Sequence, residues 1–195
     1  MVEVLKERQV VFIICAIIVS SCLLLASTAM AEPFERTASG WLNRTDFDVD
    51  ANGSPLSIVN LSGKGTFGKS TSNDVSETGP FAFEFCDFFP QDVVVVRIPI
   101  IARSTIIRFS NGDLLYASLA TDGPPSSLCV DTNSESNTSE VHLVITGGTG
   151  KFAGATGTLL VTASSTTVLR EAGFPVHVAI TRVTEGEIVL VDEDD

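Results

Sequence analysis

The stretch Val144-Ile-Thr-Gly-Gly-Thr-Gly-Lys-Phe-Ala-Gly-Ala-Thr-Gly157 decides the fold. Its five glycines are Gly147, Gly148, Gly150, Gly154 and Gly157. Glycine reaches positive φ without steric cost and lets another backbone approach closely. An alternating apolar run, Val141 to Ile145, precedes the glycines, and the strand-like run Thr158–Thr162 follows them. The pattern therefore predicts a corner between two β-strands.

A dinucleotide-binding turn is the alternative interpretation of these glycines. Such a turn needs a helix N-terminus to hold the pyrophosphate, inside a βαβ unit. The residues after Gly157 are rich in Thr, Val and Ser and show no helical period, and only 38 residues follow. A phosphate-binding GxxxxGK[ST] loop is excluded as well, because Phe152 follows Lys151. The segment thus indicates a fold and not a reaction.

The N-terminus has the pattern of an export signal. Lys6 and Arg8 precede an apolar run from Val10 to Ala26, and Ala29-Met30-Ala31 has the small-x-small form of a cleavage site. We therefore expect a helical signal peptide over residues 1–31 and a secreted, periplasmic or cell-envelope protein. An uncleaved anchor and lipidation at Cys22 are the alternatives. In each case the protein would contact a membrane only through this segment.

The charge of the chain argues against nucleic acid as a partner. The formal net charge is −12, and removal of residues 1–31 takes away two basic and two acidic residues, so the balance is unchanged. Nucleic-acid affinity depends on neutralisation of phosphates by Lys and Arg. The last four residues, 192–195, are all acidic and predict a solvated tail after a single domain over residues 32–191.

Two cysteines, Cys86 and Cys129, remain after cleavage of the signal. In an oxidising compartment they predict one disulfide, with two separate buried thiols as the alternative.

Strand patterns account for the rest of the chain. The segments with these patterns are Gly40–Leu42, Leu56–Leu61, Phe81–Phe85, Val93–Ile101, Thr105–Phe109, Leu114–Leu119, Val176–Ile180 and Ile188–Val191. Asn111-Gly112 predicts a hairpin, and Glu185-Gly186 predicts a turn. The polar runs Thr121–Pro125 and Asp131–Glu140 read as surface connections. We expect an all-β domain, closed into a barrel or folded as a two-sheet sandwich, with Pro99 at a bulge or edge.

The last third of the chain resembles a known family. Leu143–Thr162, followed by Phe174-Pro-Val-His-Val-Ala-Ile-Thr-Arg-Val-Thr-Glu-Gly186, is similar to the C-terminal half of the allene oxide cyclase barrel-like proteins. These include plant allene oxide cyclases, dirigent proteins and secreted bacterial proteins. Their G-G-x-G-x-F-x-G-A-x-G corner joins two barrel strands, and a later strand follows an F-P step. The resemblance implies a closed antiparallel β-barrel of about eight strands, an apolar ligand inside it and a homo-oligomer.

Several residues are candidates for a site. Phe81, Phe83 and Phe85 would share one face of a strand, where they either line a ligand cavity or fill a packed core. Glu84 lies on the opposite face and is a surface acid, unless a reversed face assignment buries it and makes it a general base. His142 and His177 are the only histidines, and nothing in the sequence brings them together.

A calcium site is a further candidate. Asp48, Asp50 and Asn52 match the first half of a calcium loop, but Val59 stands where the bidentate Glu belongs. A plain Asn-Gly turn explains the segment as well, and we expect no metal and no cofactor.

The leading functional hypothesis is a secreted barrel that binds a small apolar ligand or a partner protein. A cofactor-free isomerase or cyclase and a structural envelope protein are the alternatives. No catalytic residue can be assigned, because the acid and amide of the cyclases have no counterpart in this sequence.

Overall fold

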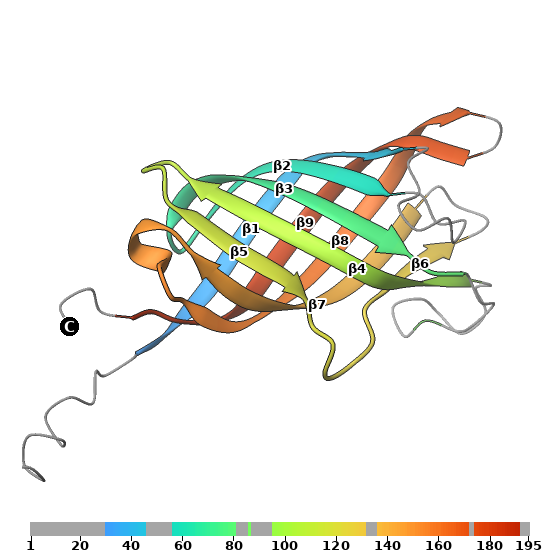
Figure 1. Cartoon of the computed structure of the whole chain (residues 1–195). Coiled ribbons are helices and arrows are strands. Elements are labelled where there is room, and N and C mark those ends of the chain that lie inside the picture. Colours follow the sequence, from blue (N-terminus) through green and yellow to red (C-terminus); the bar gives the residue numbers. More distant parts are fainter. Residues whose placement is uncertain are drawn as a thin grey trace, which may run out of the picture. The chain divides into compact units, whose positions relative to one another are not determined.

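The chain forms a closed antiparallel β-barrel of eight strands with one extra strand, β6 (Figure 1). The computed structural model describes residues 30–45, 56–80, 86, 95–131, 136–171 and 174–191. The strands are β1 (Ala31–Arg44), β2 (Ser57–Gly65), β3 (Gly68–Thr78), β4 (Val95–Phe109), β5 (Leu114–Leu119), β6 (Ser127–Asp131), β7 (Ser136–Gly148), β8 (Thr156–Glu171) and β9 (Phe174–Val189). The barrel prediction is therefore confirmed, whereas the expected signal helix lies almost wholly outside the described residues.

Strands that are consecutive in the chain pair with one another, except β5 and β6, and β1 pairs with β9 to close the circle. β5 and β6 share one place in the wall, because both lie between β4 and β7. β5 pairs with the second half of β4, and β6 pairs with the first half. The short β5 and β6 thus do the work of one long strand, interrupted by a loop.

One end of the barrel is filled with aromatic rings. Phe34, Phe67, Phe109 and Phe152 come from β1, the β2–β3 turn, β4 and the 3-10 turn η1 (Gly150–Phe152). The rings of Phe109 and Phe152 stack with centroids 4.7 Å apart, and Phe67 meets Phe152 edge to face at 5.2 Å. Such pairs add to the stabilisation from burial alone. We call these four rings the aromatic plug; η1 lies beside it, at the left in Figure 1.

The five glycines of the opening stretch lie at the β7–β8 connection. Gly147, Gly150, Gly154 and Gly157 have positive φ values of 124°, 56°, 69° and 139°. A Cβ added at Gly148 would lie 2.2 Å from the Leu114 carbonyl oxygen and 2.6 Å from the Phe152 Cβ. The chain can therefore turn tightly here and place Phe152 in the interior of the barrel.

The predicted turn at Glu185-Gly186 is wrong, because β9 runs without a break to Val189. Gly186 is present for a different reason. A Cβ at this position would lie 2.1 Å from the Thr158 carbonyl oxygen on β8. The missing side chain permits close approach of two strands and does not mark a change of direction.

The prediction that Asp131–Glu140 is a surface connection is also wrong in part. Residues 132–135 lie outside the described residues, but β7 begins at Ser136 and pairs with both β6 and β8. Asn137 is buried in spite of its polarity. A polar strand is possible here because the barrel interior at this end is itself polar, as described below.

The described residues of the segments predicted as Val93–Ile101 and Thr105–Phe109 belong to one strand, β4. The register between β3 and β4 shifts so that Ile101 has no partner on β3, which is a bulge two residues after Pro99. The hairpin at Asn111-Gly112 is confirmed by the pairing of Arg108 with Leu114.

Cys86 and Cys129 form the predicted disulfide, with 6.3 Å between their Cα atoms. Cys129 lies on β6 and is buried together with Cys86 and Val95. The bond therefore ties residue 86, which precedes β4, to the shortest strand of the barrel.

We expect the double variant Cys86→Ser/Cys129→Ser to lose stability. Opening a loop of 43 residues lowers the free energy of unfolding by about 4 kcal/mol, because the unfolded chain regains conformational entropy. Chemical denaturation with and without a reductant measures this. Reduced wild-type protein should match the double variant, and a variant as stable as oxidised wild type would contradict the prediction.

A cavity with an arginine floor

The end of the barrel opposite the aromatic plug contains a cavity of about 210 Å³. Every strand except β5 contributes to its lining. The apolar lining residues are Leu42, Val59, Ile98, Ile100, Leu128, Val130, Val178 and Ile180. The polar ones are Arg44, Ser57, Ser76, Thr78, Arg103, Asn137, Ser139, Ser165, Thr167 and Arg182. These positions follow from strand alternation, since inward residues recur every second position.

The floor of the cavity is an ion cluster. Arg103 on β4 donates from its guanidinium to Asp74 Oδ2 on β3 at 2.8 Å, and Arg182 on β9 donates to the same oxygen. The Asp74 side chain has no exposed surface, and those of Arg103 and Arg182 are 5% and 3% exposed. One carboxylate oxygen therefore serves two guanidinium groups that come from different parts of the wall.

A third arginine lies further from the cavity, toward the aromatic plug. The Arg36 Nε on β1 donates to the Ser70 hydroxyl on β3 at 2.8 Å, and the residue is 3% exposed. We call Arg36, Asp74, Arg103 and Arg182 the interior ion cluster. It separates the apolar plug from the cavity.

Burial and mutual repulsion act on the arginines of this cluster. Desolvation, followed by the charge of Arg182, lowers the pKa of Arg36 and of Arg103 to about 10. Both groups therefore stay positively charged at neutral pH. Desolvation alone would raise the pKa of the Asp74 carboxyl, but the charges of Arg103 and Arg182 outweigh it, and this pKa lies below its ordinary value.

Several polar atoms of the interior have no hydrogen-bond partner among the described residues. They are one terminal nitrogen of Arg36, the Ser72 hydroxyl, Asp74 Oδ1 and Arg182 Nε. Buried polar groups in folded proteins are nearly always satisfied. The cluster is thus built with more donors than its single carboxylate uses, because each guanidinium carries five N–H groups.

The structure does not bring the two histidines together. His142 on β7 lies opposite Leu160 on β8, whereas His177 on β9 lies opposite Leu169. These β8 positions are nine residues apart, which is roughly 30 Å along a strand. His142 is half-buried on the outer wall, with its Nε2 3.1 Å from a Glu140 carboxylate oxygen.

The other sequence candidates lie where the structure describes nothing. Phe81, Phe83, Phe85 and Glu84 fall outside the described residues, and so do the calcium candidates Asp48, Asp50 and Asn52. Within the described ranges, no group of three or more acidic, Cys or His residues could hold a metal ion.

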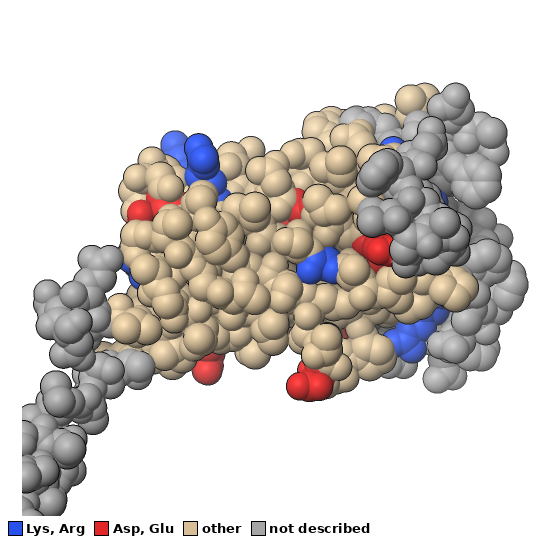
Figure 2. Space-filling view, viewed as in Figure 1, with Lys and Arg blue, Asp and Glu red and all other residues tan. Residues whose placement is uncertain are grey.

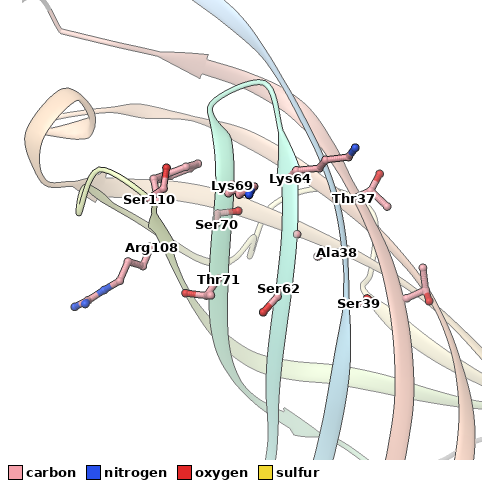
Figure 3. Close-up of a pocket in the computed structure, with 13 residues that line it drawn as sticks. Thr37, Ala38, Ser39, Ser62, Lys64, Lys69, Ser70, Thr71, Arg108 and Ser110 are labelled. Carbon is pink, nitrogen blue, oxygen red and sulfur yellow. The ribbon is translucent and has the colours of Figure 1, made fainter.

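A second hollow of about 890 Å³ lies on the outer wall (Figure 3). It is lined by Thr37, Ala38, Ser39, Ser62, Gly63, Lys64, Lys69, Ser70, Thr71, Arg108, Phe109, Ser110 and Thr181. Its three cationic side chains are exposed, and Arg108 extends away from the wall (Figure 3). Exposed charges are screened by water and salt and give weak binding. The face in Figure 2 otherwise carries few charged side chains. The inner cavity is therefore the better candidate site.

Comparison with known proteins adds no relative. A scan against protein-family models finds no match, and a search of curated proteins finds none. Within the described ranges, no helix has the length and hydropathy needed to cross a membrane. The site must be interpreted from its own geometry.

Sequence reasoning missed the interior ion cluster, although the pattern contains its signal. Val178 and Ile180 point inward at alternate positions of β9, and Arg182 is the next residue in the same alternation. Ile107 and Thr105 lead back in the same way to Arg103 on β4. A charged residue that continues an alternating run of inward-facing residues was therefore the signal from which the interior ion cluster could have been predicted.

We expect Asp74→Asn to destabilise the barrel by roughly 3 kcal/mol at pH 7, because it leaves buried arginines without an anion. The Asp74 pKa is lowered in the folded state, so its contribution is present above the unfolded pKa of about 3.9 and is lost as the pH falls through the lower folded value. The difference between variant and wild type should therefore shrink below about pH 4. Urea unfolding at several pH values measures it.

The matched control is Glu187→Gln on the same barrel, because Glu187 is exposed on the outer face of β9. It should change the free energy of unfolding by less than about 0.5 kcal/mol. A pH-independent difference for Asp74→Asn would show that its charge is not what stabilises the fold.

Proposed function

We propose that this protein is an exported barrel that binds one small ligand, with an apolar body, in the inner cavity. The observation that carries the proposal is the cavity of about 210 Å³ with apolar side chains from β1, β2, β4, β6 and β9 in its wall. Eight-stranded barrels have an interior that either fills with side chains or holds one small ligand. In this barrel the aromatic plug fills the interior at one end, and the interior at the other end contains the cavity.

The size of the cavity limits the ligand. An apolar cavity of roughly 150 Å³ binds benzene. A volume of about 210 Å³ therefore suits a single aromatic ring with a short substituent, or a short alkyl chain. Larger ligands would need the interior side chains to move.

Export is part of the same proposal. The basic residues, the apolar run and the small-x-small site of residues 1–31 support it, and so does the disulfide Cys86–Cys129, which persists in oxidising compartments.

Binding is proposed in preference to catalysis. Of the three catalytic candidates, Glu84 lies outside the described residues, the side chain of His177 is not described, and His142 lies on the outer wall. General acid–base chemistry needs a group within hydrogen-bond reach of the substrate. His142 does not line the cavity, so it does not favour the isomerase or the cyclase.

Two adjacent serines of β8 give a matched test. Ser165 lines the cavity, whereas Ser164 is exposed on the outer face of the same strand. We expect Ser165→Phe to fill the cavity and to weaken binding of the neutral single-ring probe 4-ethylphenol at least tenfold, and Ser164→Phe to leave the affinity unchanged. Isothermal titration calorimetry measures both, with circular dichroism to verify the fold.

Organic extraction of protein purified from its own export pathway, followed by mass spectrometry, identifies any bound molecule. Equal probe binding by the wild type and Ser165→Phe would place the probe elsewhere and overturn the proposal.

A further inference from the structure

We infer that the ligand carries an oxoacid anion, a carboxylate or a phosphate ester, which binds the arginine floor of the cavity while its apolar body contacts the wall. This inference rests on the proposed function and names the chemistry of the ligand that the same site takes. It comes from the charge balance, the free donors and the placement of the interior ion cluster.

The charge balance of the described interior is positive. Among the described residues, the buried ionisable side chains are those of Arg36, Asp74, Arg103 and Arg182. These three guanidinium groups exceed the one carboxylate by two positive charges. An unpaired charge away from water is strongly unfavourable. Water can solvate such charges but does not neutralise them, whereas an anion does both.

Two arginines of the interior ion cluster line the cavity. They are Arg103 and Arg182, whereas Asp74 is not among the described lining residues. The two guanidinium groups share a single carboxylate oxygen, and Arg182 Nε has no partner among the described residues. The floor of the cavity is therefore formed by two positively charged groups that share one counter-ion.

A further cation lies in the same cavity. Arg44 near the end of β1 is half-buried in the lining. Burial lowers the pKa of its guanidinium. A ligand in the cavity thus meets arginines from β1, β4 and β9, and none of the described lining residues is acidic. The planar guanidinium group can donate two parallel N–H bonds to two oxygens of a carboxylate or a phosphate.

The rest of the lining selects an amphiphile over a bare inorganic ion. Val178 and Ile180 precede Arg182 in the same inward phase of β9, and Val59 on β2 lines the cavity with them. Chloride or sulfate would gain nothing from contact with these apolar side chains. The combination favours a ring or a short chain with one anionic group, such as a substituted benzoate or a phenyl phosphate.

Matched ligands test the inference on the unaltered protein. We expect 4-ethylbenzoate to displace the neutral probe 4-ethylphenol at a concentration at least ten times lower than 4-ethylbenzamide, which has the same shape without the charge. The preference should persist in salt at roughly 0.5 M, because buried ion pairs are weakly screened. This is about five times the ionic strength at which the Debye length is about 10 Å. Phenyl phosphate and sodium sulfate, as further arms, distinguish a carboxylate, a phosphate ester and a simple ion.

Substitutions then locate the anion. Arg182→Gln should remove the preference for the acid and keep binding of the neutral probe. If that variant does not fold, Arg44→Gln, which lies outside the ion cluster, should still reduce the preference several-fold. The triple control Lys64→Gln/Lys69→Gln/Arg108→Gln removes the outer cations and should change nothing.

The outcomes separate this inference from the proposed function. Equal affinity for the acid and the amide, with the neutral probe still bound in the cavity, would overturn the inference that the ligand is an anion. The proposal that the barrel binds a small ligand would stand. If the preference for the acid over the amide were lost at high salt or in the triple variant, the anion would bind to the outer wall. This result would also overturn the inference. Failure of every probe to bind would overturn both.

Discussion

Closure of the strand circle is the constraint on which the rest of the structure depends. Because β1 pairs with β9, every strand is paired on both of its edges and every second residue must point inward. The interior of an eight-stranded barrel is only wide enough for a few side chains at each level. The identity of the inward residues therefore decides, level by level, whether the barrel is solid or hollow.

Three levels follow along the axis from this constraint. The aromatic plug closes one end, where large rings contact one another at centroid distances of 4.7 to 6.1 Å. In the middle, Arg36, Arg103 and Arg182 are accommodated because their neighbours are small: the inward residues of β3 are Ser70, Ser72, Asp74 and Ser76. At the other end, valines, isoleucines and serines are too small to fill the remaining space, and the cavity is left.

How far the sequence predicts this structure depends on which force shapes each element. The β7–β8 corner and the Asn111-Gly112 hairpin were predictable, because local backbone conformation fixes them and glycine reports that conformation directly. β3 was not predicted, since its inward face is serine and aspartate and shows no apolar alternation. The start of β7 was missed for the same reason. Strand patterns assume an apolar interior, so they fail wherever the interior is polar, and here that is at the candidate site.

The polar interior is difficult to explain by stability alone. Replacement of a buried ion pair by apolar residues of similar volume is often neutral or stabilising, because desolvation offsets the attraction between the charges. An interior of leucine and valine at the levels of Arg103 and Arg182 would extend the aromatic plug and leave no unpartnered donor. Instead, the described part of the interior carries one aspartate, Asp74, which is enough to hold two arginines in place but not to neutralise the three that are buried. Surplus guanidinium groups at the floor of a partly apolar cavity are the observation from which the proposed binding of a small acid is argued.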